Sequence, residues 1–71
     1  IDGDAEMRME MHDVDRAMAE LPAEQREVIA LVLVEGLAYR EAADVLEIPM
    51  GTLTSRLTRG RQALARRLEA A

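Results

Sequence analysis

The stretch YREAADVLEIPMGTLTSRLTRGR, residues 39–61, decides the fold of this 71-residue chain. It reads as a short helix, a tight turn and a longer helix whose outer face carries Ser, Thr and Arg side chains. Ile48 and Pro49 mark the turn, and Pro49 suits the first turn of a helix. This is the outline of a helix-turn-helix, in which the second helix enters a groove of DNA.

The last helix is expected over residues 49–69, and its two sides differ in chemistry. Successive residues rotate by about 100° around a helix, which predicts a buried stripe of Met50, Leu53, Leu57, Gly60, Leu64 and Leu68. The opposite side collects Ser55, Arg59, Gln62 and Arg66, flanked by Thr52 and Thr58. No acidic residue lies between Ile48 and Leu68. Short hydrogen-bonding side chains beside long cationic ones suit entry into a groove.

Three further helices are expected upstream, at about residues 7–20, 23–35 and 40–46. The first is indicated by apolar positions spaced three and four apart, at Met7, Met11, Val14, Met18 and Leu21. Pro22 separates it from the second helix, which ends at Gly36. Residues 1–6 are expected to form a linker or a frayed end. The predicted fold is therefore all-α: a compact four-helix domain over residues 7–71 with a C-terminal helix-turn-helix and no wing.

The second helix contains seven consecutive apolar residues, from Val28 to Val34. Such a run is apolar on every side of a helix, so in a small domain one side must face solvent or a partner. We therefore expect a partner-binding surface formed by Val28, Ile29, Val32 and Leu33.

Composition excludes several classes of function. The chain has no Cys, no Lys and a single His, His12, so neither a catalytic set nor a metal site is expected, and no cofactor is implied. No apolar run approaches the length of a membrane span, and a cytoplasmic location is expected. The missing initial Met suggests a fragment of a longer protein. Net charge is −5, yet residues 48–71 hold five Arg and one acidic residue, a basic end typical of a DNA-reading element.

The segment LPAEQREVIALVLVEGLAYREAADVLEIPMGTLTSRLTRGRQAL resembles region 4 of bacterial sigma-70-type transcription factors, particularly the extracytoplasmic-function (ECF) group. The resemblance covers residues 21 to about 68. Its most specific parts are Leu21-Pro22, Glu24-Gln25-Arg26, Glu35-Gly36-Leu37 with Tyr39, Ile48-Pro49, Gly51-Thr52, Ser55-Arg56-Leu57 and Arg59.

The resemblance implies recognition of the −35 promoter element by the last helix, docking on the β flap of RNA polymerase, and sequestration by an anti-sigma factor. Carried over by position, Thr52, Thr54, Ser55, Thr58 and Arg59 face base edges or adjacent phosphates. Arg56 and Arg61 are expected to contact phosphates, Tyr39 and Arg40 to lie near the DNA backbone, and Gln62 to share the DNA face. Thr54 and Thr58 stand where the family often has larger base-reading side chains, which predicts greater dependence on Arg59 and on DNA shape.

Two alternatives remain open from the residues alone. The domain could chiefly bind proteins, namely the polymerase β flap or an anti-sigma factor, through its acidic and apolar first half. It could also be the output domain of a LuxR-type response regulator, which shares a four-helix arrangement. The Leu21-Pro22 start and the Ile48-Pro49 turn fit sigma region 4 better.

Overall fold

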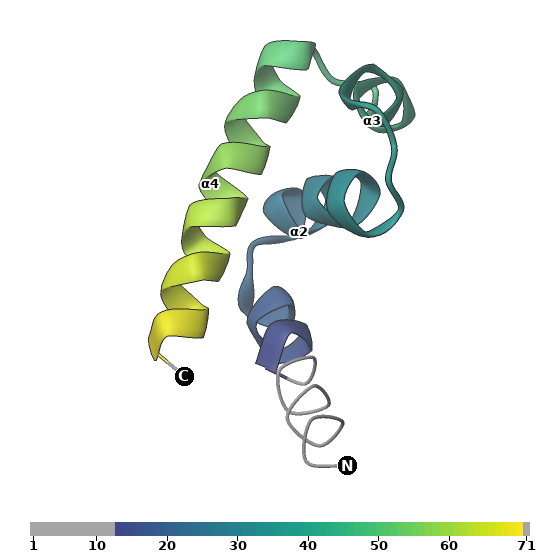
Figure 1. Ribbon diagram of the computed structural model, residues 1–71. Coiled ribbons are helices and arrows are strands. Elements are labelled where there is room, and N and C mark those ends of the chain that lie inside the picture. Colours follow the sequence, from purple (N-terminus) through teal and green to yellow (C-terminus); the bar gives the residue numbers. More distant parts are fainter. Residues whose placement is uncertain (1–12, 71) are drawn as a thin grey trace.

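The long helix α4 (Met50–Ala70) runs along one side of the molecule, and the other helices pack against it (Figure 1). The computed structural model describes residues 13–70. Within that range, residues 13–20 are helical, α2 (Ala23–Ile29) continues without a break into the π-helical turn η1 (Ala30–Val34), and α3 (Tyr39–Leu46) precedes α4. The described part of the chain contains no strand. The expected all-α, four-helix fold is confirmed.

The unit of α2 and η1 begins and ends at the residues that the sequence indicated. Pro22 has extended backbone (φ −54°, ψ 145°), and its carbonyl oxygen accepts the N–H groups of Gln25 and Arg26, each at 3.0 Å. At the other end the Glu35 N–H donates to the Ala30 carbonyl, five residues back, at 2.9 Å. Gly36 follows with a positive φ of 77°. These bonds close the helix and turn Leu37 back against the core.

The turn between α3 and α4 is held by two backbone hydrogen bonds. The Ile48 N–H donates to the Ala43 carbonyl at 3.0 Å, and the Glu47 N–H donates to the Asp44 carbonyl at 3.2 Å. This is the Schellman pattern, which needs a left-handed residue after the helix. Here that residue is Glu47, with φ 56° and ψ 46°. The turn then brings Ile48 against the core and Pro49 to the start of α4.

The start of α3 has half of a capping box. The Glu41 carboxylate accepts the Ala38 N–H at 3.0 Å, whereas Ala38 has no side-chain oxygen to return the bond. The carboxylate therefore satisfies one of the backbone donors that a helix start exposes, and it lies near the positive end of the α3 dipole.

The core is small and aliphatic. Its buried residues form one cluster of Leu21, Val28, Ile29, Ala42, Ala43, Leu53 and Leu57, and Ala17 is buried as well. Helices α2 and α4 pack closely at Gly60, where an added Cβ atom would lie 2.7 Å from Ile29 Cδ1 and 3.3 Å from Gln25 Cβ. A side chain at position 60 would require the end of the Ile29 side chain to shift, so glycine permits the close packing of the two helices seen here.

The structure corrects the expected partner surface on the second helix. Val28 and Ile29 are 0% and 2% exposed and belong to the core, so neither side chain is available to a partner. Val32 is only partly buried and packs against the core, while Leu33 is 47% exposed and Val34 75% exposed. The first residues of the run are therefore buried in the core, and only its last two, Leu33 and Val34, are exposed.

The structure can also be compared with the expected helix bounds and with the expected buried stripe of α4. The observed helices begin and end within one residue of the expected bounds, except where η1 replaces the last turn of the second helix. The expected start of the first helix, at residue 7, lies outside the described residues. Residues 1–6, Met7, Met11 and His12 all lie outside that range. Met50 and Leu68, placed in the buried stripe of α4, are 44% and 37% exposed. Among residues 13–70, no helix combines the length and the hydropathy needed to span a membrane.

The left-handed conformation of Glu47 leads to a testable prediction. A side chain with a Cβ atom is strained in this conformation, and glycine is not. The Glu47→Gly variant should therefore be more stable than the parent by up to about 1 kcal/mol, a rise in melting temperature of about 4–8 °C for a domain of this size. Thermal unfolding followed by circular dichroism measures this. Glu47→Ala is the control, because it removes the carboxylate but keeps the strain; an equal gain in both variants would contradict the explanation.

Candidate nucleic-acid interface

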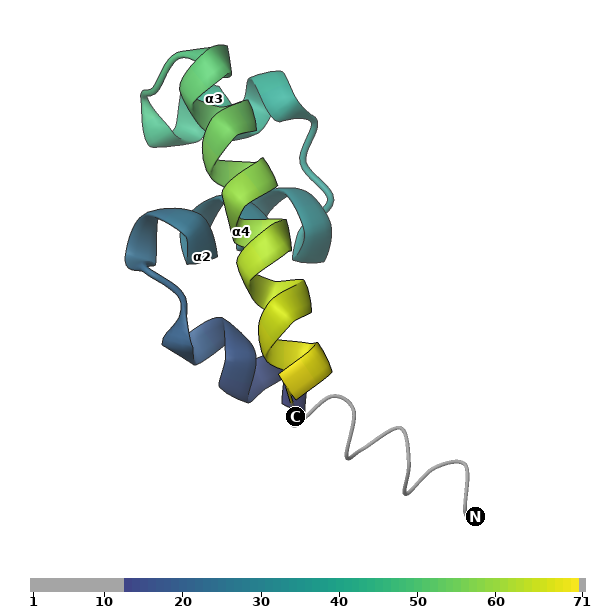
Figure 2. The same ribbon diagram turned by 90° about the vertical axis from the view of Figure 1, so that its left-hand side faces the viewer.

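The outer face of α4 is uncovered by the rest of the described chain. With the molecule turned so that α4 comes forward, the other helices lie behind it (Figure 2). Leu53, Leu57 and Gly60 are buried on the inner side. Six residues expected to contact DNA are exposed on α4: Thr54, Ser55, Thr58, Arg59, Arg61 and Gln62. Thr52, in the first turn, is half-buried.

Ser55, Arg59 and Gln62 form the centre of this face. They are three and four residues apart, so they lie on one side of the helix along about two turns, a length of roughly 10 Å. Within residues 13–70, Arg59 has no ion-pair partner. Its guanidinium therefore retains its donors for a base edge or a phosphate.

Thr54 is exposed but already uses its hydrogen. Its Oγ1 donates to the Met50 carbonyl, one turn back in the same helix, at 2.9 Å. In this arrangement the hydroxyl can accept a hydrogen bond from a ligand but cannot donate one. Thr54 therefore differs from the neighbouring hydroxyl side chains Ser55 and Thr58, for which no such bond within the helix is seen.

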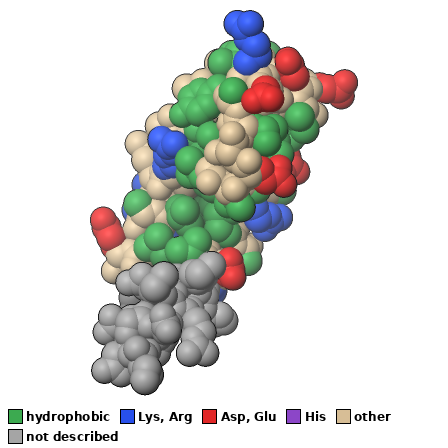
Figure 3. All heavy atoms as spheres, turned by 45° about the vertical axis from the view of Figure 1, so that its right-hand side comes forward, with side chains coloured by type: hydrophobic (Ala, Val, Ile, Leu, Met, Phe, Trp, Pro, Cys, Tyr) green, Lys and Arg blue, Asp and Glu red, His purple; other side chains and the backbone are tan. Residues whose placement is uncertain are grey.

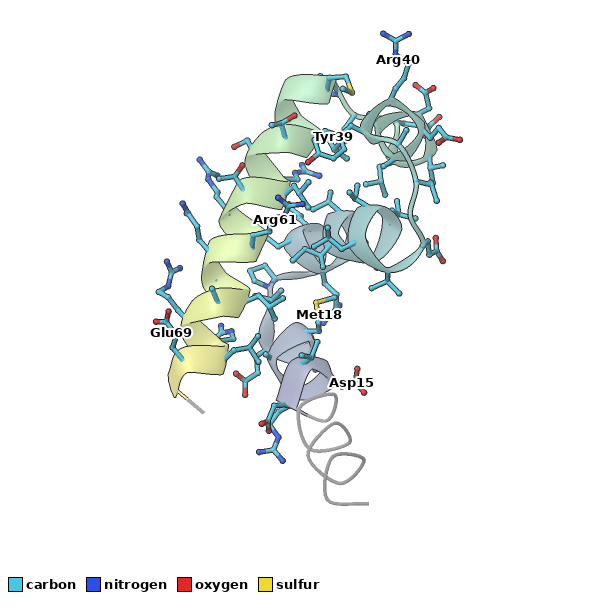
Figure 4. All side chains as sticks on the ribbon, viewed as in Figure 1. Asp15, Met18, Tyr39, Arg40, Arg61 and Glu69 are labelled. Carbon is cyan, nitrogen blue, oxygen red and sulfur yellow. The ribbon has the colours of Figure 1, made fainter. Side chains whose placement is uncertain are left out.

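Arg56 and Arg61, both expected to contact phosphates, lie on different flanks of α4. Five residues separate them, which corresponds to about 140° around the helix. Arg61 is exposed and lies on the same side of α4 as Tyr39, toward α3 and η1 (Figure 4). Arg56 lies on the flank toward α2. Its side chain is 29% exposed, and its Nε is 3.6 Å from Oε2 of Glu24.

The start of α3 contributes Tyr39 and Arg40, and the structure places them differently. The Tyr39 side chain, 38% exposed, lies between α3 and α4, whereas Arg40 points away from the body at one end of the molecule (Figure 4). Arg40 thus stands apart from the face centred on Ser55 and Arg59.

Two features of the site were missed in choosing site residues from the sequence. Arg66 is exposed, has no ion-pair partner within the described residues, and continues the outer face of α4 by two turns beyond Arg59. The angular position of Arg66 already indicated this. Glu24 had no such signal, because its proximity to Arg56 depends on the packing of α2 against α4.

The charges around α4 are unevenly compensated. Glu24 pairs with Arg56, and Glu20 pairs with Arg67 at the same distance of 3.6 Å. The Arg67 Nη2 also donates to the Glu20 carbonyl at 3.4 Å. Within the described range, Arg59, Arg61 and Arg66 have no such partner. Three of the five arginines of α4 are therefore available to an anionic ligand.

The side of the molecule that carries η1 and α3 has another character. Hydrophobic side chains are prominent on this face, with acidic and basic side chains among them (Figure 3). Leu33 and Val34 of η1 and Val45 of α3 are 47%, 75% and 61% exposed. No group of three or more His, Asp or Glu side chains within residues 13–70 is arranged to hold a metal ion.

A helix-turn-helix whose second helix presents hydroxyl, amide and arginine side chains on an uncovered face belongs to the DNA-binding class of helical domains. The comparisons with known proteins specify the family. The family model described as sigma-70, region 4, matches residues 11–64. The chain therefore belongs to the sigma-70 region 4 family, and its relatives are ECF sigma factors.

Three relatives illustrate the similarity. A probable RNA polymerase sigma-C factor of Mycobacterium bovis is 41% identical over 66 residues, which cover 90% of this chain and 36% of the relative. The ECF RNA polymerase sigma factor SigW of Bacillus subtilis is 35% identical over 66 residues, 92% of this chain and 35% of the relative. The ECF sigma factor SigE of Mycolicibacterium smegmatis is 42% identical over 52 residues, 73% of this chain and 20% of the relative.

The chain spans about a third of the length of the first two relatives. Membership of this family decides against the LuxR-type alternative weighed from the sequence. It also confirms that the domain is not an enzyme, because sigma factors are DNA-binding initiation factors without catalytic activity.

Proposed function

We propose that this domain recognises the −35 element of promoters as part of an ECF sigma factor that directs RNA polymerase to initiate transcription. The observation that carries the proposal is the outer face of α4, which combines exposed Ser55, Arg59 and Gln62 with no covering element within the described chain. This activity would place the protein in the cytoplasm.

In the proposed complex, α4 enters the major groove with its N-terminal half. Ser55, Arg59 and Gln62 face base edges, Thr52 and Thr58 flank them, and Thr54 acts as an acceptor. Arg61 and Arg56 contact phosphates on the two sides of the groove. Tyr39 and Arg40 lie at the end of the molecule where the backbone would pass. Few of these side chains read bases, so phosphate contacts supply much of the affinity and binding falls as salt rises.

Arg59 is the strongest candidate for a base contact, and its removal tests the proposal. Arg59→Ala should weaken binding of the chain to a duplex selected from a random-sequence library by about 5- to 150-fold, the loss expected for one bidentate base contact of roughly 1–3 kcal/mol. Fluorescence anisotropy measures this, and circular dichroism checks the fold.

Arg66→Ala is the matched control, because Arg66 is an equally unpaired cation two turns further along α4. Arg66→Ala should weaken binding to the selected duplex and to a scrambled duplex by the same factor. If Arg59→Ala also weakens both to the same extent, Arg59 contacts a phosphate and not a base.

Gly51 supports close approach of DNA to the start of α4. An added Cβ atom at this position would meet nothing within 4 Å, so packing within the domain does not require glycine. Glycine also lowers helix stability, by up to about 1 kcal/mol relative to alanine. Close contact with a sugar-phosphate backbone would explain why glycine stands at position 51.

Gly51→Ala should therefore leave the domain equally or more stable and still weaken its DNA binding several-fold. Thermal unfolding and anisotropy titration of the same preparation separate the two effects. If the variant is more stable and its DNA affinity is unchanged, Gly51 does not contact DNA.

A second candidate function is supported by the exposed aliphatic residues. Leu33, Val34 and Val45 lie on η1 and α3, where α4 does not cover them. We propose that this face, together with part of Val32, binds the β flap of RNA polymerase, and that an anti-sigma factor covers the same face when it sequesters the protein. DNA and protein would then occupy different sides of the domain.

The double variant Val34→Thr, Val45→Thr tests this second surface. Threonine has the shape of valine but carries a polar group, so an apolar contact should be lost while the fold is retained. Affinity for core RNA polymerase should fall about 10-fold in a pull-down titration, because each substitution replaces one methyl group that the complex would bury. DNA affinity should not change. An unchanged affinity for polymerase would exclude this face as the docking surface.

A further inference from the structure

Arg56 is the one cation of the DNA-binding half of α4 that is paired within the described chain. Its Nε lies 3.6 Å from Oε2 of Glu24, and Glu24 occupies the first turn of α2. Arg59, three residues further along the same helix, has no such partner within the described residues. The pairing therefore distinguishes two arginines that the sequence alone would treat as equivalent.

The Glu24–Arg56 pair is loose enough to exchange. A distance of 3.6 Å exceeds the roughly 2.8 Å of a charge-assisted hydrogen bond. The Glu24 side chain is 70% exposed, so solvent and ions reach it readily. Exposed pairs of this kind contribute little to stability, which means that Arg56 can leave Glu24 for another anion without unfolding the domain.

The position of Glu24 also places a negative charge beside the DNA path. Any phosphate that contacts the Arg56 guanidinium comes within a few ångströms of the Glu24 carboxylate, well inside the roughly 8–10 Å over which charges act at physiological salt. A phosphate must then displace Glu24 or bind next to it. Both lower the affinity for every DNA sequence equally, because phosphates are the same in all sequences.

We propose that Glu24 competes with DNA phosphate for Arg56 and so lowers the affinity of the domain for DNA of every sequence. The proposal rests on the function proposed above and deepens it. Base contacts by Arg59 and its neighbours are unaffected by Glu24. The phosphate contribution falls by the same factor for every sequence, so the ratio of specific to non-specific affinity stays the same while both affinities fall.

The test measures binding of the chain to a duplex of fixed arbitrary sequence between 50 and 200 mM NaCl. Glu24→Gln removes the charge but keeps an oxygen that can accept from Arg56. It should bind this duplex about 3- to 10-fold more tightly than the parent at the lower salt. The slope of log K against log salt should also steepen by up to about 1, because one more phosphate contact releases counterions.

Glu20→Gln is the matched control. Glu20 pairs with Arg67 at the same 3.6 Å, but Arg67 lies eleven residues beyond Arg56, roughly 16 Å along α4. Glu20→Gln changes the net charge by the same amount as Glu24→Gln, and it should tighten binding to the duplex by less than 2-fold. In an Arg56→Gln background, Glu24→Gln should lose most of its effect, because the competition requires Arg56.

The outcomes separate the two proposals. If the parent chain binds neither the arbitrary nor a selected duplex at 50 mM salt, the proposed DNA-binding function fails, and this inference fails with it. If the parent binds but Glu24→Gln and Glu20→Gln act equally, only the inference fails, since net charge explains both. Weaker binding by Glu24→Gln also overturns it, because Glu24 would then orient Arg56 for DNA.

Discussion

The contact between α2 and α4 at Gly60 is the constraint on which the rest of the structure depends. Gly60 allows Ile29 to lie directly against the backbone of α4, and Ile29, Val28, Leu53 and Leu57 then form an aliphatic core without any aromatic ring. In so short a chain the core is near the minimum that supports a fold, so close approach has to replace large side chains. The same contact sets the position of Glu24, because the first turn of α2 follows from where Ile29 is held.

The helix-turn-helix adds a second constraint, which is local. A Schellman turn with Glu47 in a left-handed conformation joins α3 to α4. Its two hydrogen bonds and the packing of Ile48 direct α4 away from α3 at a definite angle, at the expense of some strain at Glu47. Because the inner side of α4 is then occupied by the core, its outer side is left for a ligand. The separation of the proposed DNA face from the exposed apolar residues on η1 and α3 follows from this arrangement.

Electrostatics divides the arginines of α4 into two groups with different roles. Arg59, Arg61 and Arg66 have no ion pair within the described residues, whereas Arg56 and Arg67 are held by carboxylates of α2 and of the preceding helical segment. The acidic half of the chain therefore contributes carboxylates that form ion pairs with α4. Two of its carboxylates reduce the positive charge along one flank of α4, whereas neither of them pairs with Arg59 at the centre of its outer face.

Much of this protein could be predicted from the sequence because the signals concerned are local. Apolar spacing, Pro22, Gly36 and Pro49 determine where helices begin and end, and helical angles alone separate Leu53 and Leu57 from Ser55 and Arg59. Only the tertiary structure decided which part of the 28–34 run is buried, that η1 ends it with a π turn exposing Leu33 and Val34, and that Glu24 meets Arg56. Periodicity defines the faces of one helix but does not say which neighbour each face meets. That depends on the close approach at Gly60 and on the angle of the turn at Glu47.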